Sequence, residues 1–474
     1  MSIKTAFLTV DLSAGDTGKG SWVDAFVRHY GATLVIRSQG GAQAAHHVVM
    51  PDGRSHRFSQ FVSGLFVPGV RGHLGPKVIT DPHTMLIEAK HLEEIGVQDC
   101  WERMTFDARA LVITPFHRAV NRLRERARGV NRHGSCGMGI GETVADSLER
   151  PDLAIRLSDL IDSTDLLYRL RAVMDYKRAQ ASSLIEKLKN DPEAAEDLRI
   201  LHEPSRIACY LKLYVEFVSN AIIVSKDHLK KLIANTETPI ICEAAQGVLL
   251  DEWRGFHPHT TWSTCTLEPI NALLDECGFE GQRIRVGLVR TYATRHGAGP
   301  FVSESAQVAK AIEETHNETN PWQGAFRFGW FDAVATRYAI SACGGIDTLA
   351  VSCLDQMKLL PEWRICEGYV FEKLPLSHNQ VKDYFADYYS KCGKTGPFGS
   401  LFVKTMRLGP PEDLDHQACL TKALFAATPD LLHINVQGSH EAKIHSYLKW
   451  IESLLGIPVK YTSYGSTAVD KYFL

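Results

Sequence analysis

The most informative stretch of the sequence is Gly15-Asp16-Thr17-Gly18-Lys19-Gly20. It follows an apolar run at 3–10 that predicts a strand, and it opens a segment at 21–29 that predicts a helix. Glycines let a backbone approach a phosphate chain closely, and a helix start offers free N–H groups to an anion. Lys19 adds a positive charge that attracts phosphate. An acidic side chain would repel phosphate, so Asp16 in this turn indicates a catalytic role or a metal ligand. The spacing is not that of a Walker A loop.

A second loop reads Arg-Ser-Gln-Gly-Gly-Ala-Gln-Ala-Ala-His-His-Val-Val at 37–49, after a short predicted strand at 34–36. A glycine pair, small residues and His46 between two strands are typical of a loop below a ligand. Taken alone, each loop also fits a structural role, because an Asp in a turn often makes an Asx-turn and a single histidine is often a core or surface residue.

Together the two loops resemble those of the adenylosuccinate synthetase family, whose signatures read Gly-Asp-Glu-Gly-Lys-Gly and Gly-Gly-Asn-Asn-Ala-Gly-His-Thr-Val-Val. Further stretches resemble the family's motifs in the same order, at 134–141, 243–247, 249–251, 257–261, 294–301, 329–332, 352–355 and 456–465. The resemblance covers nearly the whole chain. It implies an α/β fold with a central, mainly parallel sheet flanked by helices.

The pattern of apolar runs favours the same fold class. Strand-like runs at 34–36, 78–80, 111–114, 240–242, 284–289 and 349–353 alternate with helical stretches, as in parallel sheets. Pro51-Asp52-Gly53 predicts a hairpin turn, and the region from about 160 to 235 is predicted to be mostly helical. Because no linker, repeat or low-complexity tract interrupts the 474 residues, we expect a single elaborated catalytic domain over 1–474.

Composition narrows the class of partner. A net charge of −3 gives no electrostatic case for nucleic acid or an anionic membrane as a partner. The 11 cysteines are scattered without a CxxC pair, which argues against a disulfide framework and against a zinc site. No apolar stretch approaches the length of a membrane-spanning helix, so a cytoplasmic protein is expected.

The resemblance implies four catalytic residues. Ligation at C6 of a 6-oxopurine requires the oxygen to be phosphorylated first, and a base that removes the N1 proton makes it a better nucleophile. The family pattern assigns the base to Asp16, stabilisation of the transferring phosphoryl group to His46, and the contact with the 6-oxygen to Gln246; Lys19 contacts phosphate. Mg²⁺ is the implied cofactor, with Asp16 and Ala45 as its protein positions.

The resemblance also implies two nucleotide sites. The substrate nucleotide would be held by Gln43, Ser135, Cys136, Arg150, Gln246 and Thr261. The triphosphate would be held by Gly15, Gly18, Lys19, Gly20, Asp355, Ser463 and Gly465, with GTP expected and ATP left open because the family's lysine beside guanine is Cys353 here. Cys136 replaces a phosphate-binding threonine and is a weaker donor. Arg150 aligns with an arginine that reaches the neighbouring subunit's site, which implies a homodimer.

The amino-donor loop departs most from the family. Where the family has an arginine-rich run, this chain has Asn-Glu-Thr-Asn-Pro-Trp-Gln-Gly-Ala-Phe-Arg-Phe at 317–328. The candidate donor-binding residues are therefore Asn320, Gln323 and Arg327, together with Arg295. The expected function is a small-molecule ligase that joins L-aspartate to C6 of IMP at the expense of GTP.

Two alternatives stay open. One is a paralogous ligase for another nucleotide, such as dGMP, or for another amine. Viral members that act on dGMP lack the base at the position of Asp16, which favours a substrate like IMP here. The other is a non-catalytic nucleotide-binding protein, against which the joint presence of Asp16, Lys19, His46 and Gln246 argues.

Overall fold

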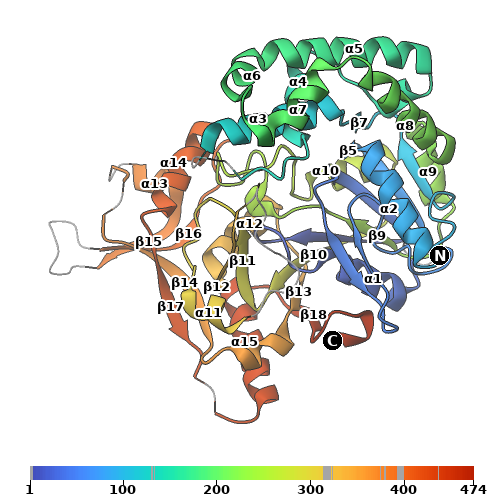
Figure 1. The fold of residues 1–474 in the computed structure, drawn as a ribbon. Helices are drawn as coiled ribbons and strands as arrows, with labels where there is room; N and C mark the ends of the chain where they lie inside the picture. Colours follow the sequence, from blue (N-terminus) through green and yellow to red (C-terminus); the bar gives the residue numbers. More distant parts are fainter. Residues whose placement is uncertain are drawn as a thin grey trace.

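An eleven-stranded sheet runs through the centre of the molecule (Figure 1). The computed structural model describes residues 4–129, 132, 134–312, 322, 324–373, 375–377, 380–391, 400–435 and 437–474. In spatial order the strands are β19 (Lys471–Phe473), β18 (Val459–Ser463), β13 (Thr348–Ser352), β10 (Gln282–Arg290), β1 (Thr5–Asp11), β9 (Ile240–Glu243), β2 (Leu34–Gly41), β5 (Arg71–Thr80), β6 (Met104–Asp107) and β8 (Ile222–Val224), with β7 (Leu111–Val112) beside β5. Every pairing in this sheet is parallel except β18 with β19.

The central strands carry apolar side chains on both faces of the sheet, because helices cover both faces. Ala6 and Leu8 of β1 pack into one core, and Phe7 between them packs into the other. The first core includes helices α9 (Lys226–Ala234), α10 (Glu268–Glu276), α12 (Ala333–Ala342) and α15 (His440–Leu455). The second includes α1 (Lys19–Tyr30) and α2 (Pro82–Glu94). The predicted fold class is confirmed.

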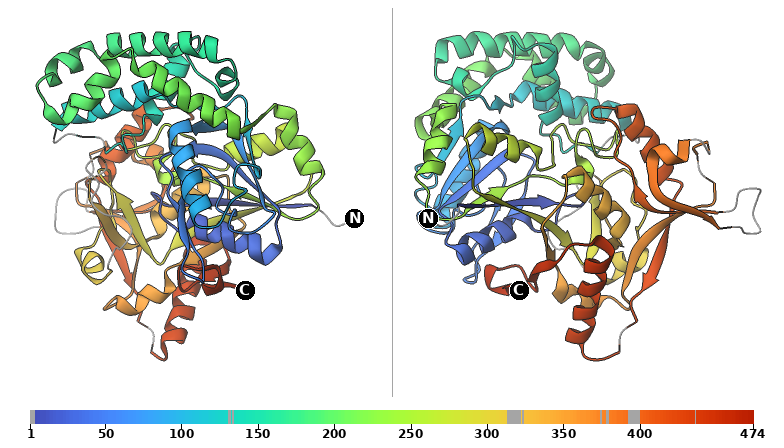
Figure 2. Two further views of the ribbon diagram at one scale, coloured as in Figure 1. Left: turned by 45° about the vertical axis from the view of Figure 1, so that its right-hand side comes forward. Right: turned by 180° about the vertical axis from the view of Figure 1, so that it is seen from behind.

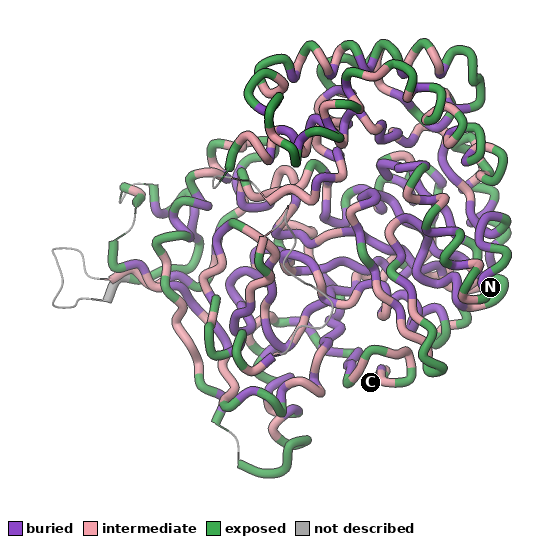
Figure 3. Tube along the Cα trace, in the orientation of Figure 1, coloured by how far each residue is buried: buried purple, intermediate pink, exposed green. Residues whose placement is uncertain are grey.

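Helices also form a layer beyond one side of the sheet (Figure 2). It contains α3 (Pro115–Arg128), α4 (Ile140–Glu149), α5 (Ser163–Gln180), α6 (Ser182–Leu188), α7 (Ala195–His202) and α8 (Arg206–Asn220). Its outer surface is exposed, whereas the central strands are buried (Figure 3). The prediction of a mostly helical region at 160–235 is confirmed, with one difference: β8 interrupts it and pairs with β6 at the edge of the sheet.

A second sheet of six strands packs beside the first. It is formed by β11 (Tyr292–His296), β12 (Phe326–Asp332), β14 (Arg364–Phe371), β16 (Ser400–Met406), β15 (Phe385–Lys391) and β17 (Thr428–His433). The short helices α11 (Ala306–Ala311) and α13 (Val381–Tyr384), and helix α14 (Leu414–Leu424), belong to the same part of the chain. The sequence pattern did not reveal this sheet. Because β11 begins directly after β10 ends, the sheet meets the functional edge of the central one.

Two local predictions can be compared with the structure. The hairpin is confirmed as β3 (His46–Val49) paired antiparallel with β4 (Ser55–Phe58). The strand predicted at 111–114 is shorter and ends at Val112, because Thr114 is the N-cap of α3 and its side chain accepts a hydrogen bond from the backbone N–H of His117.

Candidate active site

The parallel strands end side by side, and their last residues define what we call the carboxyl edge: Asp11, Gly41, Glu243, Arg290 and Ser352. Loops that leave such an edge converge on one crevice, where ligands of open α/β sheets bind. The loops following these five residues carry most of the residues that the sequence predicted. The topology therefore brings together segments that lie up to several hundred residues apart.

The glycine-rich turn is folded around the buried carboxylate of Asp11. Its Oδ2 accepts hydrogen bonds from Lys19 Nζ at 2.8 Å and from the Thr17 backbone N–H at 3.2 Å, and its Oδ1 accepts from Ser13. Burial alone would raise the pKa of Asp11, but the Lys19 charge and these hydrogen bonds lower it. Gly18 is the N-cap of α1 with a φ of 87°, a conformation that favours glycine. The turn thus presents the start of α1 to a ligand.

Asp16 lies at the tip of this turn. Its backbone adopts a left-handed conformation with a φ of 65°, and its carbonyl accepts a hydrogen bond from Arg290 Nε. Its carboxylate is 31% exposed, and Oδ2 lies 3.6 Å from Nε2 of His296. The carboxylate is therefore held at the mouth of the crevice and is open to a ligand.

His46, the first residue of β3, is fixed by the buried carboxylate of Glu243, the last residue of β9. Its Nδ1 lies 2.5 Å from Oε1 of Glu243; Oε1 also accepts a hydrogen bond from the Ser63 hydroxyl, and Oε2 accepts one from the Ser63 N–H. Burial lowers the pKa of His46 to about 4, although Glu243 opposes the shift. Burial would raise the pKa of Glu243, but His46, Arg37 and Ser63 lower it to about 2. Nε2 of His46 has no hydrogen-bond partner among the described residues, so it is available to a ligand.

Two glutamines leave buried amide atoms without partners. Within the described chain, Oε1 of Gln246 and both amide atoms of Gln43 make no hydrogen bond. Gln246 has a φ of 56° and packs against Gly40, where an added Cβ would lie 2.3 Å from that of Ala245. A buried polar atom without a partner costs about 1–3 kcal/mol, so this arrangement is typical of a site completed by a polar ligand.

The predicted substrate-phosphate loop leads into α4. Oγ of Ser135 donates to Oδ1 of Asn121 at 3.0 Å and accepts from the Gly137 N–H, while the same Asn121 oxygen accepts from the Gly139 N–H. Gly139 is the N-cap of α4, and a helix start attracts anions. Burial raises the pKa of the Cys136 thiol, which keeps it neutral and a weak donor.

Arg150 lies at the opposite end of α4 from this loop. It is bound to Asp152 through contacts of 3.0 and 2.7 Å and lies over the ring of Tyr176. A ten-residue helix is about 15 Å long, so Arg150 does not serve the same phosphate loop in its own chain. Thr261, the other predicted phosphate residue, is half-buried and its N–H donates to the Leu250 carbonyl at 2.8 Å.

The predicted base pocket is assembled from two neighbouring strands. β13 and β18 are parallel and pair at Val351 and Thr462, so Asp355 and Ser463 both follow the carboxyl ends of adjacent strands. The Ser463 hydroxyl donates to the Gly465 carbonyl at 2.9 Å, and an added Cβ at Gly465 would lie 2.6 Å from Cγ of Asp470.

Two arginines face each other across the β11–β12 pair. Arg295 and Arg327 occupy opposite register positions. Arg295 is buried and donates to the carbonyls of Ala298 and His259, and burial with the nearby Arg327 lowers its pKa to about 10. Arg327 binds Glu304 and donates to the Gly297 and Gly299 carbonyls. Asn320 and Gln323 lie outside the described residues.

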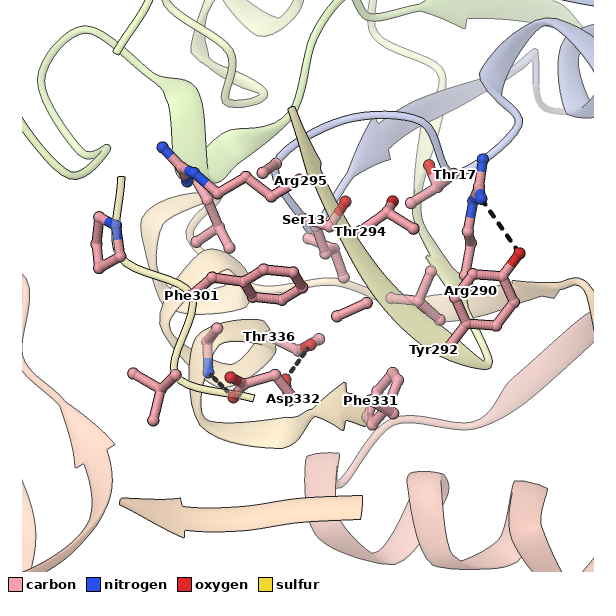
Figure 4. A pocket seen from close by; sticks show the side chains of 18 of the residues that line it. Ser13, Thr17, Arg290, Tyr292, Thr294, Arg295, Phe301, Phe331, Asp332 and Thr336 are labelled. Atoms are coloured by element: carbon pink, nitrogen blue, oxygen red, sulfur yellow. Dashed lines mark hydrogen bonds between the residues drawn. The ribbon is translucent and has the colours of Figure 1, made fainter. Parts of the chain in front are cut away.

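A mostly apolar pocket lies beside the glycine-rich turn (Figure 4). Phe301, Phe331 and Tyr369 line it, and Arg290 and Arg295 lie at its rim. Of the predicted residues, Arg295 alone is part of its lining. Burial raises the pKa of Asp332 at its floor to about 6, although the Ala335 N–H and the Tyr369 hydroxyl donate to this carboxyl group. The predicted catalytic residues do not line this pocket.

Three residues that contact predicted site residues were not among the candidates themselves: Glu243, Arg290 and His296. Each contacts a predicted residue, His46 or Asp16, from a distant part of the chain. Glu243 stands in the quoted motif at 243–247, so its position beside Gln246 was the signal available. His296 likewise stands in the quoted motif at 294–301, and Arg290 directly follows the strand predicted at 284–289.

The described residues contain no group of three or more His, Cys, Asp or Glu side chains suited to hold a metal ion by themselves. None of their helices has the length and apolar character needed to cross a bilayer.

Comparison with known proteins gives consistent results. The family model described as adenylosuccinate synthetase matches residues 9–394. An adenylosuccinate synthetase of Clostridium beijerinckii is 30% identical over 385 residues, covering 80% of this chain and 83% of the relative. One from Gloeothece citriformis is 31% identical over 389 residues, covering 80% and 79%.

Two solved structures have a similar fold. The fully ligated adenylosuccinate synthetase of Plasmodium falciparum superimposes over 100% of both chains with a TM-score of 0.74 and 16% identity. The succinoaminodeoxyadenylate synthetase of cyanophage S-2L, bound to dGMP and to dATP as an energy donor, matches 99% of this chain and 95% of its own with a TM-score of 0.58 and 17% identity.

Proposed function

Because this chain belongs to the adenylosuccinate synthetase family of C–N ligases, we propose that it joins L-aspartate to C6 of IMP with GTP as the phosphoryl donor. The observation that carries the proposal is the carboxyl edge itself. The loops that follow it carry Asp16, whose carboxylate is 31% exposed, and two residues with buried atoms that lack a hydrogen-bond partner among the described residues, Nε2 of His46 and Oε1 of Gln246.

These groups suit the chemistry of phosphorylating a 6-oxopurine. Asp16 takes the proton from N1, so that electron density moves to the 6-oxygen, which attacks the γ-phosphorus while the bond to the β-phosphate oxygen breaks. Gln246 donates to the 6-oxygen, and Nε2 of His46 contacts the transferring phosphoryl group. The amino group of the donor then attacks C6, the C6–O bond breaks, and phosphate leaves with the oxygen.

The buried pair of His46 and Glu243 keeps this contact in place. Since Nδ1 of His46 is engaged by Glu243, the ring orientation is fixed and Nε2 is the nitrogen left without a partner among the described residues. A negatively charged phosphoryl group near Nε2 favours the protonated ring, which offsets the low pKa that burial imposes. The imidazole can then donate to the phosphoryl oxygens as charge develops on them.

The residues present fit Mg²⁺, which prefers oxygen ligands and commonly uses one or two carboxylates with substrate phosphates. Asp16 supplies a carboxylate that is 31% exposed, and Ala45 is the exposed residue of the loop between β2 and β3. When bound, the ion would supply charge to screen the triphosphate. Asp355 would accept from N1–H and the amino group of guanine, an arrangement that adenine does not match.

A second candidate is a related ligase with a different nucleotide or amine. Three departures favour it: Gln43 in place of an asparagine, Cys136 in place of a threonine, and the altered loop before Arg327. The structural similarity to a phage enzyme bound to dGMP and dATP adds a concrete alternative pair of nucleotides.

The deciding experiment crosses IMP, GMP and dGMP with aspartate and neutral amino acids, each with Mg²⁺ and either GTP or ATP. Phosphate release and product mass are measured. We expect turnover with IMP, aspartate and GTP and a product heavier than IMP by the amino acid less one water, because the 6-oxygen leaves with phosphate. Turnover with dGMP or with a neutral amine alone would select the second candidate, and no turnover with any combination would contradict both.

A further inference from the structure

His296 contributes a second imidazole to the crevice, and it faces Asp16. Its Nε2 lies 3.6 Å from Oδ2 of Asp16, which is within ion-pair range and slightly longer than a hydrogen bond. Contacts of this kind in enzymes without substrate are often long and shorten when the substrate binds. The ring is 21% exposed and packs its other side against Phe326 at a centroid distance of 4.6 Å.

One short segment holds Asp16 at two points. Arg290, the last residue of β10, donates from Nε to the Asp16 carbonyl, and His296, the last residue of β11, meets its carboxylate. The first contact fixes a backbone conformation that residues other than glycine adopt at a cost. The second acts on a side chain that is 31% exposed.

The protonation of the ring is compatible with a donor at Nε2. Nδ1 of His296 is buried and has no hydrogen-bond partner among the described residues. The tautomer of a neutral imidazole is set by its partners, and the Asp16 carboxylate is the acceptor that faces the ring. Nε2–H therefore points to Oδ2, which leaves the other carboxylate oxygen for chemistry.

We infer that His296 is a positioning residue that orients the Asp16 carboxylate toward the substrate base; this rests on the proposed function of Asp16 as the proton acceptor. Orientation matters because a displacement of about 1 Å in a reacting group can cost on the order of a hundredfold in rate. A residue that acts only through Asp16 changes kcat and leaves the affinity for nucleotide unchanged.

The test compares three substitutions in the intact protein. In His296→Gln the side-chain amide nitrogen reaches about as far as Nε2, whereas in His296→Asn the same amide stops near the position of Nδ1; His296→Leu removes both. We expect kcat to fall about tenfold in the Asn and Leu variants, with KM for nucleotide unchanged, and to be largely retained in the Gln variant. In an Asp16→Asn background, His296→Leu should cause no further loss.

The control is His73→Leu, since His73 is a buried imidazole on β5 whose described partner is Thr105. It is expected to change thermal stability and leave kcat unaltered. The inference is overturned if His296→Leu has a normal kcat, if KM for nucleotide rises with kcat unchanged, or if Gln and Asn behave alike. A parent protein inactive with every nucleotide and amine would instead overturn the proposed function, and this inference with it.

Discussion

The loops at the carboxyl edge and the β11–β12 pair differ in whether their polar side chains already have hydrogen-bond partners within the protein. At the edge, His46 is anchored by Glu243 on one side of its ring, yet its Nε2 and the Gln246 amide oxygen have no partner among the described residues. Across β11 and β12, Arg295 and Arg327 already donate to protein carbonyls or to Glu304. The edge is therefore preorganised for a ligand, whereas these two cations are engaged by the protein itself.

The difference shows where specificity can vary. A buried polar atom that is held in place without a hydrogen-bond partner costs free energy until a ligand supplies that partner. Such atoms therefore select ligands with a matching donor or acceptor. Cations with internal partners must exchange those partners before they bind a carboxylate. We therefore expect nucleotide chemistry to depend on single residues at the edge. We expect binding of the amino donor to depend on whether its carboxylate displaces the protein partners of these arginines.

The first and largest effect concerns Asp16. Replacing it with asparagine keeps the shape and the αL tolerance of the turn but removes the base, so kcat should fall on the order of 10²–10⁴-fold. Binding of GTP and IMP, measured by calorimetry, should stay nearly normal. Near-normal turnover would show that the edge does not supply the base.

A smaller loss is expected when the anchor of His46 is changed. Glu243→Gln removes the charge that holds Nδ1, and partners of this type are worth on the order of 10–100-fold in activity. The loss should appear in kcat, measured by phosphate release. Asp107→Asn removes another buried carboxylate, one that binds Arg109 at the end of β6, and should alter stability alone. Equal losses in both variants would make the effect a general one of destabilisation.

The loop and strand patterns predicted much of this edge. The turn at 15–20 and the second loop at 37–49 could be recognised because glycine placement and strand periodicity are local signals. The contacts of Asp16 with Arg290 and His296 were not predictable, since they form only when β10 and β11 are placed beside β1. The second sheet was missed for a similar reason: its pairings are mostly antiparallel and join distant segments.

Arg150 tests whether the edge is completed by another subunit. We propose a homodimer in which Arg150 serves the neighbouring site, because it lies at the far end of α4 from its own phosphate loop. Arg150→Leu and Asp16→Asn should each be inactive alone. After subunit exchange about half of the dimers are mixed, each with one site free of both defects, so activity should recover to about a quarter. No recovery after exchange verified by mass would contradict a shared site.

The next prediction concerns Arg327 and the KM for aspartate. If Arg327 binds the donor, Arg327→Leu should raise the KM for aspartate roughly tenfold or more, since a charge-assisted hydrogen bond is lost, while KM for IMP and GTP stays unchanged. Glu304→Gln is the matched variant because it removes the competing carboxylate, and it should leave KM for aspartate equal or lower. If both substitutions raise that KM, Arg327 supports the loop and does not bind the donor.

The smallest expected effect lies outside both regions and separates stability from function. Burial lowers the pKa of His73 to about 4, from an ordinary value of 6.5. The unfolded chain therefore binds this proton more readily, so the contribution of His73 to stability is unchanged above pH 6.5 and becomes unfavourable as the pH falls toward 4. At about 1.4 kcal/mol for each unit of pKa, the full effect is at most about 3 kcal/mol.

Denaturant unfolding between pH 7 and pH 4.5 should show a smaller loss of stability in His73→Leu than in the parent. The control is His202→Leu, which removes an exposed imidazole and should follow the parent. Parallel curves for all three proteins would place the acid sensitivity elsewhere, and the buried His46 at the carboxyl edge, whose pKa is also lowered to about 4, would be the next residue to substitute.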